Sequence, residues 1–461
     1  MSDQSVSTFE KNLRGRLIRP TDADYDSARA LYNGMIDKRP RLIARCVDAA
    51  DVMTAVNFAR SEGLLLAIRG GGHNGPGLGS CDDGLVIDLS TLKGVRVDAE
   101  KGTVRVEPGC TSGDVDHATH AFGLAVPFGI VSTTGVAGLT LGGGTGYLTR
   151  RHGLTIDNLL EADVVLADGS FVTASTSQNA DLFWAIRGGG GNFGVVTSFL
   201  FQAHPVSMVY AGPIFWEATH ARSIMRMYRD FISSAPEDLG IFVGLKTVPP
   251  MDPFPKDYWG KRACAIIGAY NGSAADGERT MAPLLKNLPP PIFNWMSAIP
   301  FPAINALFDP FFPKGLQWYW KGDYVKDLPD EAIDTHIAQA GQAPSDLCLM
   351  HLYPIDGAVH RVARDATAWS ARDARWSMVI AGIDSDPKKA GALKTWGRAY
   401  WKAVHPYNLA GAYVNFMMDD EAADRVQATY GENYARLALA KAKYDPQNLF
   451  RVNQNIVPAA V

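Results

Sequence analysis

Several features that would narrow the class of a protein quickly are missing from this sequence of 461 residues. No run of about 18 apolar residues occurs, which is the length that a membrane-spanning helix needs. The formal net charge is only −4, so the basic excess typical of nucleic-acid binding is absent. The N-terminal stretch also lacks the apolar core of a secretory signal. We therefore expect a cytoplasmic protein that binds neither a membrane nor nucleic acid.

Cysteine is scarce as well. The chain has five, at Cys46, Cys81, Cys110, Cys264 and Cys348. They are widely spaced and form no C-x-x-C pair, and their odd number argues against a full disulfide framework. A reduced protein is the expectation, and no cysteine stands out as reactive from the sequence.

Strands and helices alternate in the first 200 residues. RLIARC (41–46) and LLLAI (64–68) are predicted strands, separated by a helix that Asp48 caps. Residues 95–107 predict a hairpin, and DVVLADGSFVTA (163–174) predicts a second one around an Asp-Gly turn. With 47% hydrophobic residues, a chain of this length can bury the cores of two or three domains.

The composition changes after about residue 208, where proline and aromatic residues become frequent. HLYPI (351–355), WSMVIAGI (376–383) and GAYVNFMM (411–418) are predicted strands with helices between them. We expect a second domain here, built as an antiparallel sheet with helices.

Glycine, in contrast, is abundant and clustered. The clusters are AIRGGGHNGPGLG (67–79), GIVSTTGVAGLTLGGGTG (129–146) and RGGGGNFGVV (187–196). Backbone N–H groups without side chains can hold a pyrophosphate, although a single cluster is more often a turn. Three clusters favour a large nucleotide cofactor. The third contains G-x-G-x-x-G but follows a predicted helix and precedes a strand, the reverse of the Rossmann order.

Together with IDLS (87–90) and the tail YDPQNLFRVNQNI (444–456), these motifs resemble the berberine-bridge-enzyme-like oxidases, within the vanillyl-alcohol oxidase and PCMH flavoproteins. The resemblance implies an α+β fold. A two-lobed α/β FAD-binding domain of the PCMH type is expected over 1–208. A substrate domain with an antiparallel sheet flanked by helices is expected over 209–444. Residues 445–461 are expected to return to the FAD domain.

The resemblance also implies where FAD binds. In the family a histidine in the position of His73 carries the flavin covalently on its 8α-methyl group. No second histidine and no carboxylate except Asp82 and Asp83 stands near it in the sequence, so we expect no metal site. The other implied FAD contacts are Arg69, Gly70, Gly71, Gly72, Asn74, Gly129, Thr133, Thr134, Gly135, Gly138, Gly142, Gly143, Gly144, Gly146, Val196 and Asn453.

The sequence departs from the family in one informative place. Many relatives attach FAD a second time through a cysteine, and Val131 stands in that position here. We therefore expect a single attachment, at His73.

Three residues after Val131, Thr134 occupies the position that the resemblance implies for the family's oxygen gatekeeper. Its size is close to that of valine, which is common there in oxidases, so access of O2 is favoured.

The residue in the family's position for the catalytic base is also unusual. Several relatives use the last tyrosine of a Y-x-N-Y stretch, where this chain has Phe416. His351 and Tyr353 are the remaining candidates, because they alternate onto one face of a predicted strand and histidine suits proton transfer near neutral pH. Trp320 and Tyr324 are candidates for substrate binding. The alternative for all four residues is packing within the sheet.

The function predicted is a covalent-FAD oxidase. It would oxidise a small organic alcohol, amine or carbohydrate hydroxyl by hydride transfer to flavin N5, with O2 as the acceptor. Two alternatives stay open: a dehydrogenase that uses another acceptor, and a binding protein that has lost its chemistry. The sequence specifies neither the substrate nor the oligomeric state.

Overall fold

A four-stranded sheet organises the N-terminal lobe in the computed structural model, which describes residues 2–460. Its order is β1-β2-β4-β3, with β4 parallel to both β2 and β3 and β1 antiparallel at the edge. The strands are β1 (Arg16–Ile18), β2 (Leu42–Arg45), β3 (Leu66–Arg69) and β4 (Leu85–Asp88), and the helices are α1 (Asp3–Lys11), α2 (Tyr25–Arg29) and α3 (Ala49–Ser61). Asp48 caps α3 by accepting a hydrogen bond from the Asp51 backbone N–H, as predicted.

A five-stranded antiparallel sheet forms the second lobe, in the order β5-β6-β10-β8-β9. Both predicted hairpins are confirmed, as β5–β6 and as β8–β9. The strands are β5 (Val95–Asp98), β6 (Thr103–Val106), β8 (Leu159–Val165), β9 (Phe171–Ser175) and β10 (Val195–Gln202). The helices are α4 (Ser112–His120), α5 (Val136–Leu141), α6 (Thr149–His152) and α7 (Ala180–Ile186), and β7 (Leu124–Ala125) pairs with β11 (His204–Pro205).

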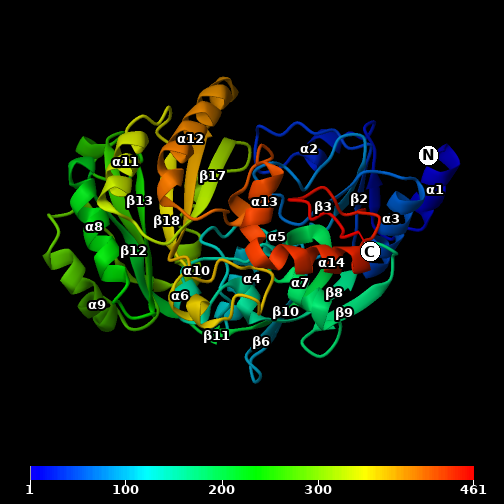
Figure 1. The fold of residues 1–461 in the computed structure, drawn as a ribbon, viewed down its shortest axis with the longest axis horizontal. Helices are drawn as coiled ribbons and strands as arrows, with labels where there is room; N and C mark the ends of the chain where they lie inside the picture. Colours follow the sequence, from blue (N-terminus) through cyan, green and yellow to red (C-terminus); the bar gives the residue numbers. More distant parts are fainter. Residues whose placement is uncertain (1, 461) are drawn as a thin grey trace.

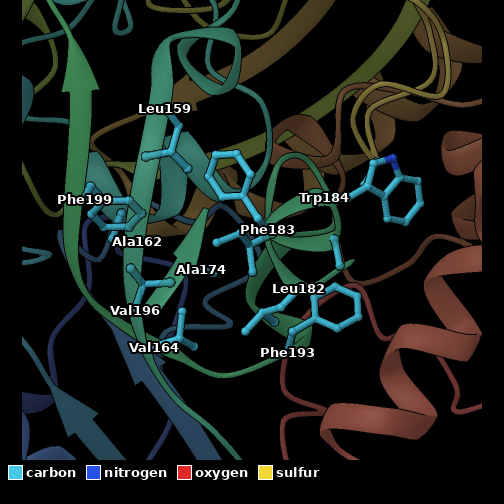
Figure 2. Packing of buried hydrophobic residues seen from close by; sticks show 14 of the residues in the cluster. Leu159, Ala162, Val164, Ala174, Leu182, Phe183, Trp184, Phe193, Val196 and Phe199 are labelled. Carbon is cyan, nitrogen blue, oxygen red and sulfur yellow. The ribbon is translucent and has the colours of Figure 1, made fainter. Parts of the chain in front are cut away.

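Helix α7 fills the core of this second lobe. Figure 2 shows Phe183 and Leu182 directed at the strand residues Leu159, Ala162 and Val164. Large side chains in this cluster are almost fully buried, and each contributes about 1.5–3 kcal/mol to the stability of the fold. Val196 on strand β10 packs into the same core.

The second half of the chain is built on one large antiparallel sheet, shown in green and yellow in Figure 1. Its strands are β12 (Met208–Glu217), β13 (Leu239–Thr247), β14 (Arg262–Tyr270), β15 (Phe293–Asn294), β16 (Ser297–Pro300), β17 (Gln317–Val325), β18 (Leu349–Pro354) and β19 (Trp376–Asp384). The helices of this half are α8 (Ala221–Ile232), α9 (Ala274–Lys286), α10 (Phe301–Asn305), α11 (Asp330–Ala340) and α12 (Ala390–Val404).

The two faces of the large sheet pack against different parts of the molecule. Met350 and Leu352 on β18 and Met378 on β19 pack with the helices α8, α9, α11 and α12. Because successive side chains of a strand point to opposite faces, the intervening residues, among them Tyr353 and Val379, point to the other face. The helices therefore cover one face and leave the other available to the first half of the molecule. The predicted fold class, α+β with an antiparallel sheet flanked by helices, is confirmed.

One strand prediction was wrong. GAYVNFMM (411–418) forms no strand, and its central residues Val414–Phe416 make a single 3₁₀ turn. The sequence does alternate as in a strand, but the hydrogen-bonding groups of this segment do not pair with a neighbouring strand. The Ala412 N–H donates to the Thr429 hydroxyl, and the Tyr413 hydroxyl accepts from the backbone of Gly144. Tertiary contacts have replaced strand pairing.

The C-terminal helices α13 (Ala423–Tyr430) and α14 (Tyr434–Tyr444) lie against the first half of the molecule, coloured orange and red in Figure 1. Residues from Ala412 onward join the core around α7, which is earlier in the chain than the predicted return at residue 445. A fully buried ion pair, Lys441 Nζ to Asp445 at 2.6 Å, anchors the tail. Lys441 also donates to the carbonyl oxygens of Asn192 and Phe450.

Within residues 2–460, no helix has the length and apolar character needed to cross a membrane.

We predict that Asp445→Asn will destabilise the protein, because it leaves the buried Lys441 ammonium without its counter-charge. Loss of one partner of a buried pair costs about 3–5 kcal/mol. Urea unfolding of the flavin-loaded protein measures this change. Lys443→Met is the matched control, since Lys443 pairs with Asp181 on the surface, where an ion pair contributes about 0–1 kcal/mol. Equal effects of the two changes would contradict the anchoring role.

Candidate active site

An elongated cavity of about 360 Å³ runs between the two lobes and the uncovered face of the large sheet. Apolar side chains of the first half, including Leu66, Ile68, Val196 and Phe450, line part of it. Backbone of the glycine loops lines another part. The remaining wall comes from β17, β18 and β19 and from the 413–416 turn. The cavity thus joins all the segments that carried the sequence motifs.

Two of the glycine loops touch through their backbones. A Cβ atom at Gly71 would lie 2.5 Å from the Cα of Gly135, which is closer than any side chain allows. Thr111 and Gly135 also form an isolated β-bridge. The absence of side chains at Gly71 and Gly135 is therefore what allows the 69–75 loop and the 129–138 segment to share one wall of the cavity.

Asn33, which the sequence analysis did not single out, ties the first glycine loop to the large sheet. Its Nδ2 donates to the carbonyl oxygens of Gly75 at 2.7 Å and Trp318 at 3.0 Å, and its Oδ1 accepts from the Trp318 N–H at 3.0 Å. The indole of Trp320 lies directly over Gly75, in the space that a Cβ would occupy. No motif surrounds Asn33, so only the folded chain reveals this bridge.

His73 lies in the cavity wall, half-buried. Its ring stacks on Tyr32 with ring centroids 3.8 Å apart and an angle of 19° between the planes, and the Tyr32 hydroxyl donates to the Phe312 carbonyl at 2.6 Å. Burial lowers the pKa of His73 to about 4, although a hydrogen bond to the Thr133 backbone acts in the opposite direction. The imidazole is therefore neutral near pH 7 and held in one orientation.

His351 and Tyr353 form a pair on the large sheet. The His351 Nδ1 and the Tyr353 hydroxyl are 2.7 Å apart, and both side chains line the cavity. Burial, and secondarily the charge of Lys246, lowers the pKa of His351 to about 3, while burial raises the pKa of Tyr353. The imidazole edge occupies the place of a side chain at Gly244 on the neighbouring strand, so this glycine makes room for it.

Tyr413 and Asn415 bring the 413–416 turn into the same wall. The Tyr413 hydroxyl accepts hydrogen bonds from the Gly144 N–H and from Asn415 Nδ2, both at 2.8 Å. Burial raises the pKa of Tyr413 to about 12, so it is a neutral phenol at pH 7. Because both of its acceptor sites are used, its own proton is free to be donated. Phe416, in the place of the family's tyrosine, also lines the cavity.

The structure corrects the expectation for one group of predicted cofactor contacts. They do not line the cavity. A Cβ would collide with Asn415 at Gly142, with Thr155 at Gly144 and with the Phe128 carbonyl at Gly146, and it would fit only tightly against Trp369 and Tyr413 at Gly143. These glycines serve internal packing around the turn at 142–146. The other glycine contacts predicted from the resemblance do line the cavity, at Gly70, Gly71, Gly72, Gly129, Gly135 and Gly138.

Two further predictions are corrected. Tyr324 is buried away from the cavity, in a small cluster with Trp369 and Tyr413, so it cannot contact a substrate there. Trp320, four residues earlier on β17, does line the cavity, so its role in substrate binding stays a prediction. Thr133 faces a second, solvent-facing hollow on the outer side of the His73 loop rather than the main cavity.

The cavity wall holds several buried polar atoms that have no partner among residues 2–460. They are Arg69 Nη1, Trp318 Nε1, Trp320 Nε1, His351 Nε2, Tyr430 OH and Asn453 Oδ1. Unpaired buried polar atoms are costly and rare in proteins, so their concentration along one cavity indicates a polar ligand. An apolar strip, a backbone-lined middle and an aromatic sheet together suit a molecule with a base, a pyrophosphate and a fused ring system.

Comparison with known proteins agrees with this geometry. The family model "FAD binding domain" matches residues 40–175, and the model "Berberine and berberine like" matches residues 412–457. An FAD-linked oxidoreductase of Dictyostelium discoideum is 30% identical over 99% of this chain and 97% of its own length. The chain belongs to the berberine-bridge-enzyme-like family of FAD-linked oxidoreductases.

Two other relatives show how the family varies. A chitooligosaccharide oxidase of Gibberella zeae is 27% identical over 96% of this chain and 93% of its own length. The crystal structure of 6-hydroxy-D-nicotine oxidase from Arthrobacter nicotinovorans superposes with a TM-score of 0.86 at 26% identity, covering 97% of this chain and 98% of that one. The enzyme is therefore an FAD-linked oxidoreductase of a family that handles very different small molecules.

Proposed function

We propose that this protein is an oxidase that carries FAD covalently on one histidine, His73, and oxidises a small organic molecule with O2 as the electron acceptor. The observation that supports the proposal is that one cavity is lined both by His73 with the glycine loops and by the His351–Tyr353 pair. Bound there, FAD supplies a hydride acceptor, and the chain supplies the binding, the orientation and the proton transfer.

His73 is suited to hold the flavin. A nitrogen can form a bond to carbon only while it carries a lone pair, and the lowered pKa of His73 keeps the imidazole neutral at physiological pH. The stack on Tyr32 and the hydrogen bond to the Thr133 backbone fix the direction of the ring. Attachment at the 8α-methyl group, as the family resemblance implies, would use this prepared orientation.

A second covalent link has no residue to form it. Val131 stands in the cavity wall where many relatives have cysteine, and none of the residues that line the described cavity is a cysteine. Cys110, the closest cysteine upstream in the sequence, is fully buried, and its Sγ contacts the Gly94 carbonyl at 3.7 Å. Burial raises the pKa of Cys110 to about 12, so its reactive thiolate form is suppressed.

We predict that acid precipitation will leave the wild-type protein yellow, whereas His73→Ala will release its flavin into the supernatant. Mass spectrometry of flavin-bearing peptides should find only the His73 peptide. His117→Ala is the control, because His117 lies exposed on α4. A cysteinyl-flavin peptide, or acid-stable flavin in His73→Ala, would contradict single attachment.

Removal of the substrate's proton is assigned to the His351–Tyr353 pair. The Tyr353 hydroxyl can donate to the neutral Nδ1 of His351, which leaves the phenolic oxygen able to accept a proton from a substrate hydroxyl. If the hydroxyl is absent, Nδ1 can accept that proton directly. His351 is thus the final acceptor in both cases. This role also fits Phe416, which cannot act as a base.

We predict that His351→Ala will slow flavin reduction by substrate about 10²–10⁴-fold, the range expected for loss of a general base. Tyr353→Phe should have a smaller effect. Stopped-flow absorbance under anaerobic conditions measures both rates. Because the pKa of His351 is lowered to about 3, the imidazole is neutral down to about pH 5, and protonation of His351 should cause no decline between pH 8 and pH 5. Equal and small effects of both changes would remove His351 from the mechanism.

Access of O2 is supported by Thr134, which lines the cavity and is no larger than the valine that is common in oxidases of this family. We predict that flavin reduced by dithionite will reoxidise in air-saturated buffer much faster than free reduced flavin. Thr134→Leu should slow this step about tenfold, equivalent to about 1.4 kcal/mol. Rapid mixing measures the rate. Reoxidation no faster than that of free flavin would identify a dehydrogenase instead.

A further inference from the structure

The part of the cavity wall formed by the large sheet and by the segment before β17 is largely apolar. Trp318, Leu349 and Val379 line it from the sheet, Phe308 and Phe312 from the preceding segment, and Phe416 from the 413–416 turn. Among residues 2–460, the polar side chains that this region and the neighbouring 413–416 turn present to the cavity are the His351–Tyr353 pair, the amide of Asn415, the Tyr413 phenol and the two unpaired indole N–H groups of Trp318 and Trp320. This wall can satisfy one or two polar groups of a ligand, but not many.

No aspartate or glutamate is among the described residues that line the cavity. A positive charge lies on the same face of the sheet, beside the cavity wall. Lys246 lies on β13 one position beyond Leu245, which pairs with Met350, and its charge lowers the pKa of His351.

Lys246 is itself unusual. Its Nζ lies 5.7 Å from the ring centroids of Phe215 and Phe311 and 5.8 Å from that of Phe308. Among residues 2–460 it has no carboxylate within ion-pair distance. Burial lowers the pKa of Lys246 to about 8, so at pH 7 it is mostly a cation, held by aromatic faces without a counter-charge to cancel its field.

These observations bear on the substrate. An ammonium group entering this wall would be desolvated without a partner carboxylate and beside a like charge, which is strongly unfavourable. A saccharide would bury several hydroxyl groups against phenyl and aliphatic surfaces, and each unpaired hydroxyl costs about 1–3 kcal/mol. A flat apolar ring gains free energy from the same surfaces.

We propose that the substrate is a neutral, largely apolar alcohol that carries an aromatic or alicyclic ring. The inference rests on the proposed function, because the same cavity has to hold the flavin. The ring packs among Phe308, Phe312 and Trp318, and the single hydroxyl meets Tyr353 and His351. Bound FAD would supply the hydride acceptor, and O2 the final two-electron oxidant. The alcohol would give up a hydride from its carbon and the hydroxyl proton to the Tyr353–His351 pair, so that a carbonyl forms and these two hydrogens leave with O2 as H2O2.

The test compares three probes on the flavin-loaded protein under anaerobic conditions at pH 7: 2-naphthalenemethanol, 2-naphthylmethylamine and cellobiose. The first two have the same ring and differ in charge, because the amine is protonated. The flavin is first reduced with dithionite so that no probe can be oxidised, and binding is followed by isothermal titration calorimetry. We expect the alcohol to bind about tenfold or more tightly than the amine, and cellobiose to bind more weakly than either.

Variants locate the effect in the wall. Val379→Asp adds a carboxylate to the cavity and should reverse the preference in favour of the amine. Val379→Asn has the same shape without the charge and should not. Lys246→Met should reduce the discrimination between alcohol and amine, because it removes the unbalanced positive charge.

Three results would overturn the proposal. They are equal or tighter binding of the amine or cellobiose by the wild-type protein, absence of binding of 2-naphthalenemethanol at millimolar concentration, and an unchanged preference in Val379→Asp. Failure of the proposed function would look different, since the binding order would persist in a protein whose flavin is extracted by acid or does not react with O2.

Discussion

The backbone contact between Gly71 and Gly135 is the constraint on which the rest of the site depends. A side chain at either position would separate the two loops, since a Cβ would come within 2.5 Å of the opposite backbone. With this contact closed, His73 and the backbone of both loops line the same cavity. The cavity exists because two segments about sixty residues apart in the chain can touch there.

The large sheet completes the site because one of its faces is covered by helices and the other is turned towards the cavity. Helices α8, α9, α11 and α12 cover one face, and the other closes over the glycine loops through Asn33 and Trp320. Asn33 bonds to backbone atoms of both Gly75 and Trp318, and its Oδ1 also accepts from the Met35 N–H, so it ties the 69–75 loop to the sheet. The alternation of residues along β18 then delivers His351 and Tyr353 to the ligand and their neighbours to the core.

The charges around the site follow one pattern. Carboxylates are plentiful outside the cavity, as in the Asp323 and Asp420 networks with Arg425 and Arg398, but none is among the described residues of its lining. Inside, burial keeps His73 and His351 neutral and Tyr413 protonated. The chain thus prepares a site with neutral proton donors and acceptors, in which the flavin brings most of the charge.

Local sequence was sufficient for much of the fold and for the flavin-binding loops. The hairpins, the Asp48 helix cap and the strands that carry His351 depend on turn chemistry and side-chain period, which act over a few residues. The glycine clusters indicated a cofactor for a similar reason, since a local excess of glycine is enough to show that the backbone there is closely approached.

Only the tertiary structure decided which residues face the cavity. Gly142, Gly143 and Gly144 match the family motif, yet they pack against Asn415, Trp369 and Thr155. The 411–418 segment alternates like a strand, yet its polar groups bond to the glycine loops and to α13. Trp320 and Tyr324 lie on the same strand, but Trp320 lines the cavity and Tyr324, four residues further on, is buried in a core cluster. Sequence by itself determined the cofactor class and most of the secondary structure, because those depend on local chemistry. Long-range packing determined the Asn33 bridge, the space that Gly244 leaves for His351 and the absence of carboxylates from the described cavity lining, because each depends on neighbours that the fold brings together from distant parts of the chain.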